Sequence, residues 1–128
     1  MDATVKDKIL AGIDAAIELS HGEAVKAGWW HNIHTGEPLD RNKGELLCLI
    51  HSEISEAMEG VRKDLMDDKL PHRKMVEVEL ADAVIRILDF CGAFNLDLAG
   101  AILEKAEFNA KREDHKVENR RKEGGKSF

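Results

Sequence analysis

The chain has 128 residues, of which 43% are hydrophobic and 34% charged, and its net charge is −6 at pH 7. These values predict one domain with a modest core, exclude a disordered chain, and argue against broad nucleic-acid binding, so no nucleic-acid partner is expected. No run approaches the ~20 apolar residues of a membrane helix and no apolar signal segment opens the chain, so we expect a cytoplasmic protein without a membrane partner.

The first predicted helix runs from about residue 4 to residue 20, where apolar residues recur at helical spacing. Ser20 and Glu23 then repeat a capping-box pattern, so a short second segment is expected to start there and to end at Gly28. Residues 29–41 are expected to form a loop, because Gly, Pro and Asp interrupt the helical pattern there.

The next predicted helix covers about residues 42–64, and Asn42 with Glu45 can cap its start. A polar turn follows at 63–71, and the third long helix is predicted over about 72–94. That helix is apolar nearly all round, so in a chain this short it is expected to be covered by a second subunit, as a homo-dimer or tetramer.

The last predicted helix starts near Asp97. Since no strand-like alternation is present, the expected fold class is all-α, a four-helix bundle with short connections. The expected domain organisation is one all-α domain over 1–115 and a basic, partly flexible tail over 116–128. Residues 111–128 carry seven basic and four acidic residues, a formal charge of +3. Cys48 and Cys91 lie in apolar helical stretches and are expected to be buried free thiols.

Two pairs of acidic residues are the most informative feature of the sequence: Glu53 with Glu56, and Glu79 with Asp82. Each pair has i, i+3 spacing, so on a helix its carboxylates lie on one face, roughly 60° apart around the axis. The second pair interrupts an apolar helix, where carboxylates are rare unless something pairs with them. An antiparallel pairing of the two helices can bring all four carboxylates to one point.

Four converging carboxylates require a cation, and Mg²⁺ fits an all-oxygen ligand set, with Mn²⁺ as a possible substitute. A di-iron bundle needs Glu-x-x-His on two helices, and only Glu18 with His21 has that spacing. The alternative is that the acids are solvated or form salt bridges with Arg86 and nearby lysines. Arg86 itself is expected to pair with its helix neighbours Asp82 or Asp89, or to span a subunit interface.

The order of these motifs resembles the MazG-like, all-α nucleoside triphosphate pyrophosphohydrolases. E-x-x-E is followed after 22 residues by E-x-x-D, and the segment Lys105-Ala-Glu-Phe-Asn-Ala-Lys-Arg112 resembles the downstream K-x-x-x-N-x-x-R element. The stretches LIHSEISEA and ELADAVIRILD and the terminal GGKSF are also similar to those of small single-domain members. The resemblance covers roughly Gly28 to the end of the chain.

The resemblance implies hydrolysis of a (deoxy)nucleoside triphosphate between its α and β phosphates, giving the monophosphate and pyrophosphate in nucleotide-pool clean-up. The four carboxylates would then hold Mg²⁺, with Glu53 or Glu56 as the general base. Lys105 and Arg112 would contact phosphate oxygens, and Asn109 would hydrogen-bond the sugar or a phosphate. Two alternatives remain open: a phosphoribosyl-ATP pyrophosphohydrolase, and a non-catalytic helical interaction module.

Trp29 and Trp30 follow Gly28 in the predicted loop. One interpretation is that they stack on the base of a nucleotide, since every base has a π-face. The other is that one or both fill the end of the bundle, which is the commoner place for a tryptophan.

Overall fold

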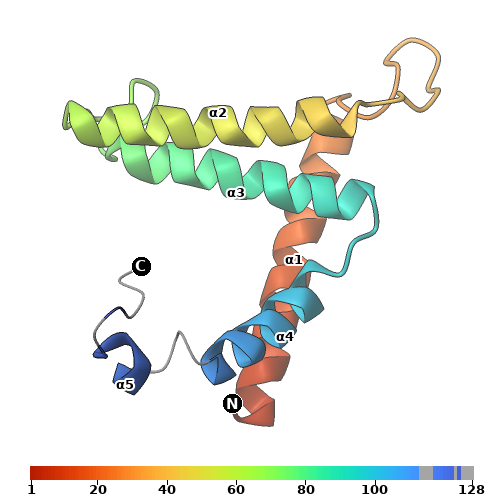
Figure 1. Ribbon diagram of the computed structural model, residues 1–128. Coiled ribbons are helices and arrows are strands. Elements are labelled where there is room, and N and C mark those ends of the chain that lie inside the picture. The colour runs from red at the N-terminus through yellow and green to blue at the C-terminus, as the bar shows by residue number, and fades with distance from the viewer. Residues whose placement is uncertain (113–116, 123, 125–128) are drawn as a thin grey trace. The chain divides into compact units, whose positions relative to one another are not determined.

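The computed structural model describes residues 1–112, 117–122 and 124, and the regular elements of that part of the chain are all helices (Figure 1). Within it, the only β-type pairings are two isolated antiparallel bridges, His31 with Pro38 and Met66 with Lys74. The expected all-α class is therefore confirmed, whereas the MazG-type bundle and its completion by oligomerisation stay predictions. The helices are α1 (Ala3–Lys26), α2 (Lys43–Arg62), α3 (Met75–Ala93), α4 (Leu98–Lys111) and the short α5 (Val117–Arg120).

The chain forms two compact units. One covers Ala15–Leu96 and holds the second part of α1 with α2 and α3, and the other joins Met1–Asp14 to the chain from Asp97 onward. In this second unit, Lys6 of α1 forms an ion pair with Glu107 of α4 at 2.5 Å. Helix α5 lies within the expected tail, of which residues 116, 123 and 125–128 are outside the described residues. The division into a domain over 1–115 and a tail stays a prediction.

Helix α1 is longer than predicted. No separate segment begins at Ser20, because the helix runs on to Lys26 and Ser20 is buried within it. A glycine inside a helix costs only about 1 kcal/mol relative to alanine, so Gly22 does not end it. Gly28, at a φ of +85°, marks the turn out of the helix as expected.

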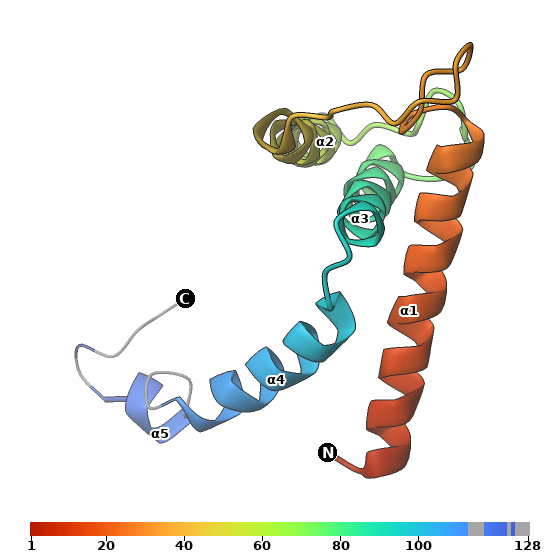
Figure 2. The same ribbon diagram turned by 90° about the vertical axis from the view of Figure 1, so that its right-hand side faces the viewer.

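Helices α2 and α3 form an antiparallel hairpin and lie side by side in both views (Figures 1 and 2). Asn42 caps α2 as predicted, because its side-chain oxygen accepts a hydrogen bond from the backbone N–H of Glu45 at 2.9 Å. At the other end of α2, a Cβ added to Gly60 would lie 3.0 Å from the side chain of Met75. The absence of a side chain at Gly60 therefore allows the start of α3 to approach α2 closely.

The connection between α2 and α3 is longer than the predicted turn, so α3 begins at Met75 rather than near residue 72. Asp67 organises this connection. Asp67 is only 6% exposed, and its carboxylate accepts hydrogen bonds from the backbone N–H groups of Lys69 and Leu70, at 3.0 and 2.8 Å. Such a side-chain to backbone turn competes with helix formation, which explains the later start of α3.

The core of the described residues is small, and α3 is not buried on several sides within this chain. Leu80, Val84 and Ile85 of α3 are each 45–51% exposed. The prediction that both cysteines are buried was wrong for one of them: both are free thiols and Cys91 is buried, but Cys48 is exposed. No helix in the described part of the chain has the length and apolar character to cross a membrane. The buried apolar residues are Trp30, Ala57, Ala83, Leu88, Cys91, Ala99 and Leu103.

Candidate metal centre

The α2–α3 hairpin brings three of the four predicted carboxylates together. Glu53 and Glu56 of α2 and Glu79 of α3 each offer an oxygen, and these oxygens all lie within 4.8 Å of one another. Their convergence follows from the i, i+3 spacing on α2 and the antiparallel packing of α3 against it. A cluster of this size has the oxygen ligands that Mg²⁺ prefers.

Glu79 is the most perturbed residue of this cluster. Burial, followed by its contacts with Glu53 and Glu56, raises the pKa of Glu79 from 4.5 to about 8. Its Oε2 atom is buried and accepts no hydrogen bond. The carboxylates of Glu53 and Glu56 are themselves acceptors when ionised, so they donate nothing to this oxygen, and a shared proton or a cation would satisfy it.

Asp82 lies one turn further along α3 and is half-buried. Burial raises its pKa first, and the negative charges of Glu53 and Asp67 raise it further. The positive charge of Arg86 acts in the opposite direction on this pKa. The fourth predicted ligand thus lies in the same electrostatic environment as Glu53, although it is not among the three converging oxygens.

Arg86 supplies the positive charge that faces the cluster. Its Nε donates a hydrogen bond to Oε1 of Glu53 at 3.0 Å, which joins α3 to α2. The alternative that the acidic residues form salt bridges with Arg86 is confirmed for Glu53, whereas the described ion pair of Arg86 is not with Asp82 or Asp89. Glu53 is only 9% exposed, so this pair offsets part of the cost of burying its carboxylate.

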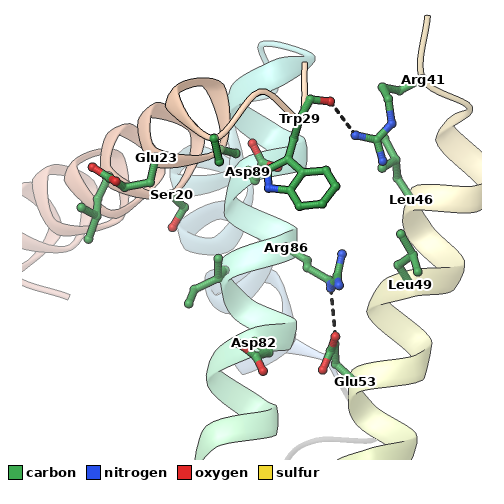
Figure 3. Close-up of a pocket in the computed structure, with 14 residues that line it drawn as sticks. Ser20, Glu23, Trp29, Arg41, Leu46, Leu49, Glu53, Asp82, Arg86 and Asp89 are labelled. Carbon is green, nitrogen blue, oxygen red and sulfur yellow. Dashed lines mark hydrogen bonds and ion pairs between the residues drawn. The ribbon is translucent and has the colours of Figure 1, made fainter. Parts of the chain in front are cut away.

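A pocket of about 800 Å³ opens beside this ion pair. Figure 3 shows Arg86 reaching from α3 towards Glu53 on α2, while α1 and the loop after it border the pocket elsewhere. Charged groups of both signs line it, and the carboxylates outnumber the guanidinium groups. The charged lining residues are Glu23, Arg41, Glu53, Asp82, Arg86 and Asp89.

The two tryptophans have different environments. Trp30 is 9% exposed, and its indole Nε1 donates a hydrogen bond to Oδ1 of Asp89 at 2.9 Å. The same oxygen contacts Nδ1 of His21 at 2.8 Å, and the Trp30 ring packs edge-on against His21 and Phe94. Trp30 is therefore the packing tryptophan, and it ties the loop to both α1 and α3.

Trp29 is 62% exposed and lines the pocket. Its backbone carbonyl accepts a hydrogen bond from Nη1 of Arg41 at 2.8 Å (Figure 3). The Arg41 guanidinium also lies 5.4 Å from the centre of the Trp30 ring. These two contacts hold the loop beside the pocket. Of the two tryptophans, only Trp29 has an exposed ring at the pocket.

The predicted phosphate-binding residues lie in the other unit. Lys105 of α4 places its Nζ 4.6 Å from the centre of the Phe108 ring. Asn109 has a buried Oδ1 without a hydrogen-bond donor, and Arg112 follows the last turn of α4. Their participation in the site formed by the α2–α3 hairpin stays a prediction.

Sequence reasoning missed two residues near the carboxylates. Asp67 lies in the connection between α2 and α3, and its negative charge raises the pKa of Asp82. The sequence indicates only that Asp67 stands among turn-forming residues, not that it lies near Asp82. Asp89 was considered only as a partner of Arg86, because its hydrogen bond with Trp30 depends on tertiary packing. Comparison with known proteins gave no match among family models, curated proteins or solved structures.

Proposed function

We propose that this chain is a Mg²⁺-dependent nucleoside triphosphate pyrophosphohydrolase, which cleaves between the α and β phosphates. The observation that supports this proposal best is the cluster of Glu53, Glu56 and Glu79, in which a buried Glu79 oxygen has no hydrogen-bond donor. Such an oxygen fits a cation, and a bound polyanion would bring further oxygen ligands to that cation. The order of the sequence motifs adds the reaction class by resemblance.

The roles of the residues follow from their environments. Glu53, Glu56, Glu79 and Asp82 would hold the metal, which when bound neutralises phosphate charge and activates water. Glu56 is the better general base of the two considered, because it is exposed while Glu53 is buried and paired with Arg86. Trp29 would stack on the base from the edge of the pocket. Lys105, Asn109 and Arg112 would contact the phosphates and sugar.

A homo-dimer or tetramer belongs to the same proposal. The hairpin leaves apolar side chains of α2 and α3 exposed, among them Ile54, Met58, Leu80 and Val84. A second copy that covered them would bury apolar surface that costs free energy in water. Light scattering across a range of concentrations measures this directly, and a monomer at every concentration contradicts it.

A pyrophosphate-release assay across a nucleotide panel tests the activity. The panel includes the four common ribonucleoside triphosphates, the four deoxynucleoside triphosphates and phosphoribosyl-ATP, each with Mg²⁺. Glu56→Gln and Glu79→Gln are expected to abolish release, because each removes a ligand or a base. Glu59→Gln on α2 and Glu77→Gln on α3 are matched controls, because each removes a carboxylate from an ion pair outside the cluster, on the same helix as Glu56 or Glu79 respectively.

The outcomes separate the alternatives. Pyrophosphate release from phosphoribosyl-ATP alone would favour the dedicated relative over nucleotide clean-up. No release from any member of the panel, together with a melting temperature that Mg²⁺ leaves unchanged, would favour a non-catalytic interaction module. Full activity in Glu56→Gln and Glu79→Gln would refute the proposed site.

A further inference from the structure

Among the charged residues of the pocket that the proposed reaction does not use, Arg86 is the one that pairs with a proposed metal ligand, Glu53. It lies on the face of α3 that carries Asp82 and Asp89, one turn after Asp82, which is roughly 6 Å along the helix axis. It therefore stands beside the carboxylate cluster, on the side where the pocket opens. A cation at this point can face either the carboxylates or an anion in the pocket.

The contacts of Arg86 leave most of its hydrogen-bonding capacity free for a ligand. A guanidinium has five N–H donors, and the hydrogen bond described for Arg86 uses only Nε. Its side chain is 42% exposed, whereas that of its partner Glu53 is 11% exposed. The arginine can thus move towards solvent without unfolding either helix, while the carboxylate stays in place.

The other arginine of the pocket is held more firmly. Arg41 donates to the carbonyl of Trp29 and lies over the ring of Trp30, so two contacts fix it to the loop. Arg86 has one described hydrogen-bond partner, Glu53, and its charge also acts on Asp82; both are proposed metal ligands. Any cation that binds Glu53 weakens the attraction between Glu53 and Arg86, because the charge of the carboxylate is then shared.

We propose that Arg86 exchanges partners during substrate binding: it neutralises Glu53 in the metal-free protein and contacts a phosphate of the nucleotide once a metal ion takes Glu53. The inference rests on the proposed function, whose site it deepens. A planar guanidinium suits this task, because it binds a carboxylate or a phosphate through paired N–H donors. Arg86 would then make metal binding and nucleotide binding favour one another.

The exchange predicts that Arg86→Gln changes metal affinity and nucleotide affinity in opposite directions. Without nucleotide, Mn²⁺ should bind about two- to fivefold more tightly than to wild type, because the competing cation is gone. With saturating Mn²⁺, a nucleotide analogue should bind about tenfold or more weakly, because a charged hydrogen bond to phosphate is lost. Isothermal titration calorimetry measures both, using the α,β-methylene analogue of the nucleotide that wild type cleaves fastest.

Two further variants distinguish the phosphate contact of Arg86 from the effect of its charge and from the effect of removing any arginine from an ion pair. Arg86→Lys keeps the charge but loses the paired donors, so Mn²⁺ affinity should stay within about twofold of wild type while analogue affinity falls about fivefold. Arg62→Gln alters an exposed pair with Glu59 on α2 and should change neither value. Unchanged analogue affinity in Arg86→Lys would overturn the phosphate contact, and weaker Mn²⁺ binding in Arg86→Gln would overturn the competition.

The same experiments distinguish this inference from the proposed function. If wild type releases pyrophosphate and binds Mn²⁺ but Arg86→Gln binds metal and analogue as wild type does, the partner exchange fails and the enzyme assignment stands. If wild type releases no pyrophosphate from any nucleotide, the enzyme assignment fails, and the role of Arg86 in substrate binding fails with it.

Discussion

Replacing Glu79 with glutamine should remove a pH dependence of stability that the carboxylate cluster creates. Burial and the nearby Glu53 and Glu56 raise the pKa of Glu79 from 4.5 to about 8. Between these two pH values the unfolded chain has lost the proton and the folded chain still holds it. The folded state then binds more protons, so the stability of the metal-free protein falls as pH rises from about 4.5 to about 8. The raised pKa of Asp82 acts in the same direction.

The magnitude follows from the size of the shift. A change from 4.5 to about 8 corresponds to about 4–5 kcal/mol at 1.36 kcal/mol per pH unit. Glu56 is exposed, so water screens the cluster, and we expect about 1–2 kcal/mol. Glu79→Gln has no titrating proton, so its stability should match that of wild type near pH 4 and exceed it by that amount at pH 8.5. In a chain of this size, each kcal/mol shifts the melting temperature by about 3–6 °C.

The assay is thermal unfolding at several pH values, with a chelator and then with Mg²⁺. At pH 8.5, Mg²⁺ at 100 times its Kd should stabilise wild type by about 2.7 kcal/mol, and Glu79→Gln should gain much less. Glu77→Gln, which alters an exposed pair with Arg73, should follow wild type throughout. Parallel pH curves for wild type and Glu79→Gln would refute the reasoning about the cluster. Equal stabilisation of both by Mg²⁺ would exclude Glu79 as a ligand.

Three further predictions concern the loop and the start of α2. Trp30→Phe should lower the free energy of unfolding by about 1–3 kcal/mol, because Asp89 loses a hydrogen-bond donor. Urea unfolding measures this loss, and an unchanged urea midpoint would contradict the packing role of Trp30. Trp29→Ala should weaken nucleotide binding by about 1–3 kcal/mol with little effect on folding, and an unchanged KM would exclude stacking. Asn42→Ala should destabilise the protein by about 1 kcal/mol through loss of the cap to Glu45, whereas Asn42→Ser should retain most of that stability.

Local signals in the sequence predicted what local chemistry decides. Asn42 caps α2 and Gly28 turns the chain after α1, because each acts on its own backbone within a few residues. The carboxylate cluster could also be predicted from the sequence, since i, i+3 spacing on two helices limits where the side chains can point. The all-α class followed from apolar periodicity alone.

Tertiary packing decided the rest. The environments of Trp29 and Trp30 differ because Asp89, 59 residues from Trp30, accepts the indole hydrogen bond of one and not the other. Arg86 pairs with Glu53, 33 residues away, rather than with neighbours on its own helix. Helix α1 continues past Ser20 although a capping pattern is present there. No local pattern carries these choices, because they depend on which helices meet.

The contrast between the two tryptophans gives the protein two optical reporters. The chain has no tyrosine, so Trp29 and Trp30 account for its fluorescence when excited near the red edge of the indole band. Trp30, buried beside a carboxylate and an imidazole, will report the integrity of the loop and its packing against α1 and α3. Trp29, exposed at the pocket, will report what enters it. Single-tryptophan variants therefore allow folding and ligand binding to be followed separately in the same protein.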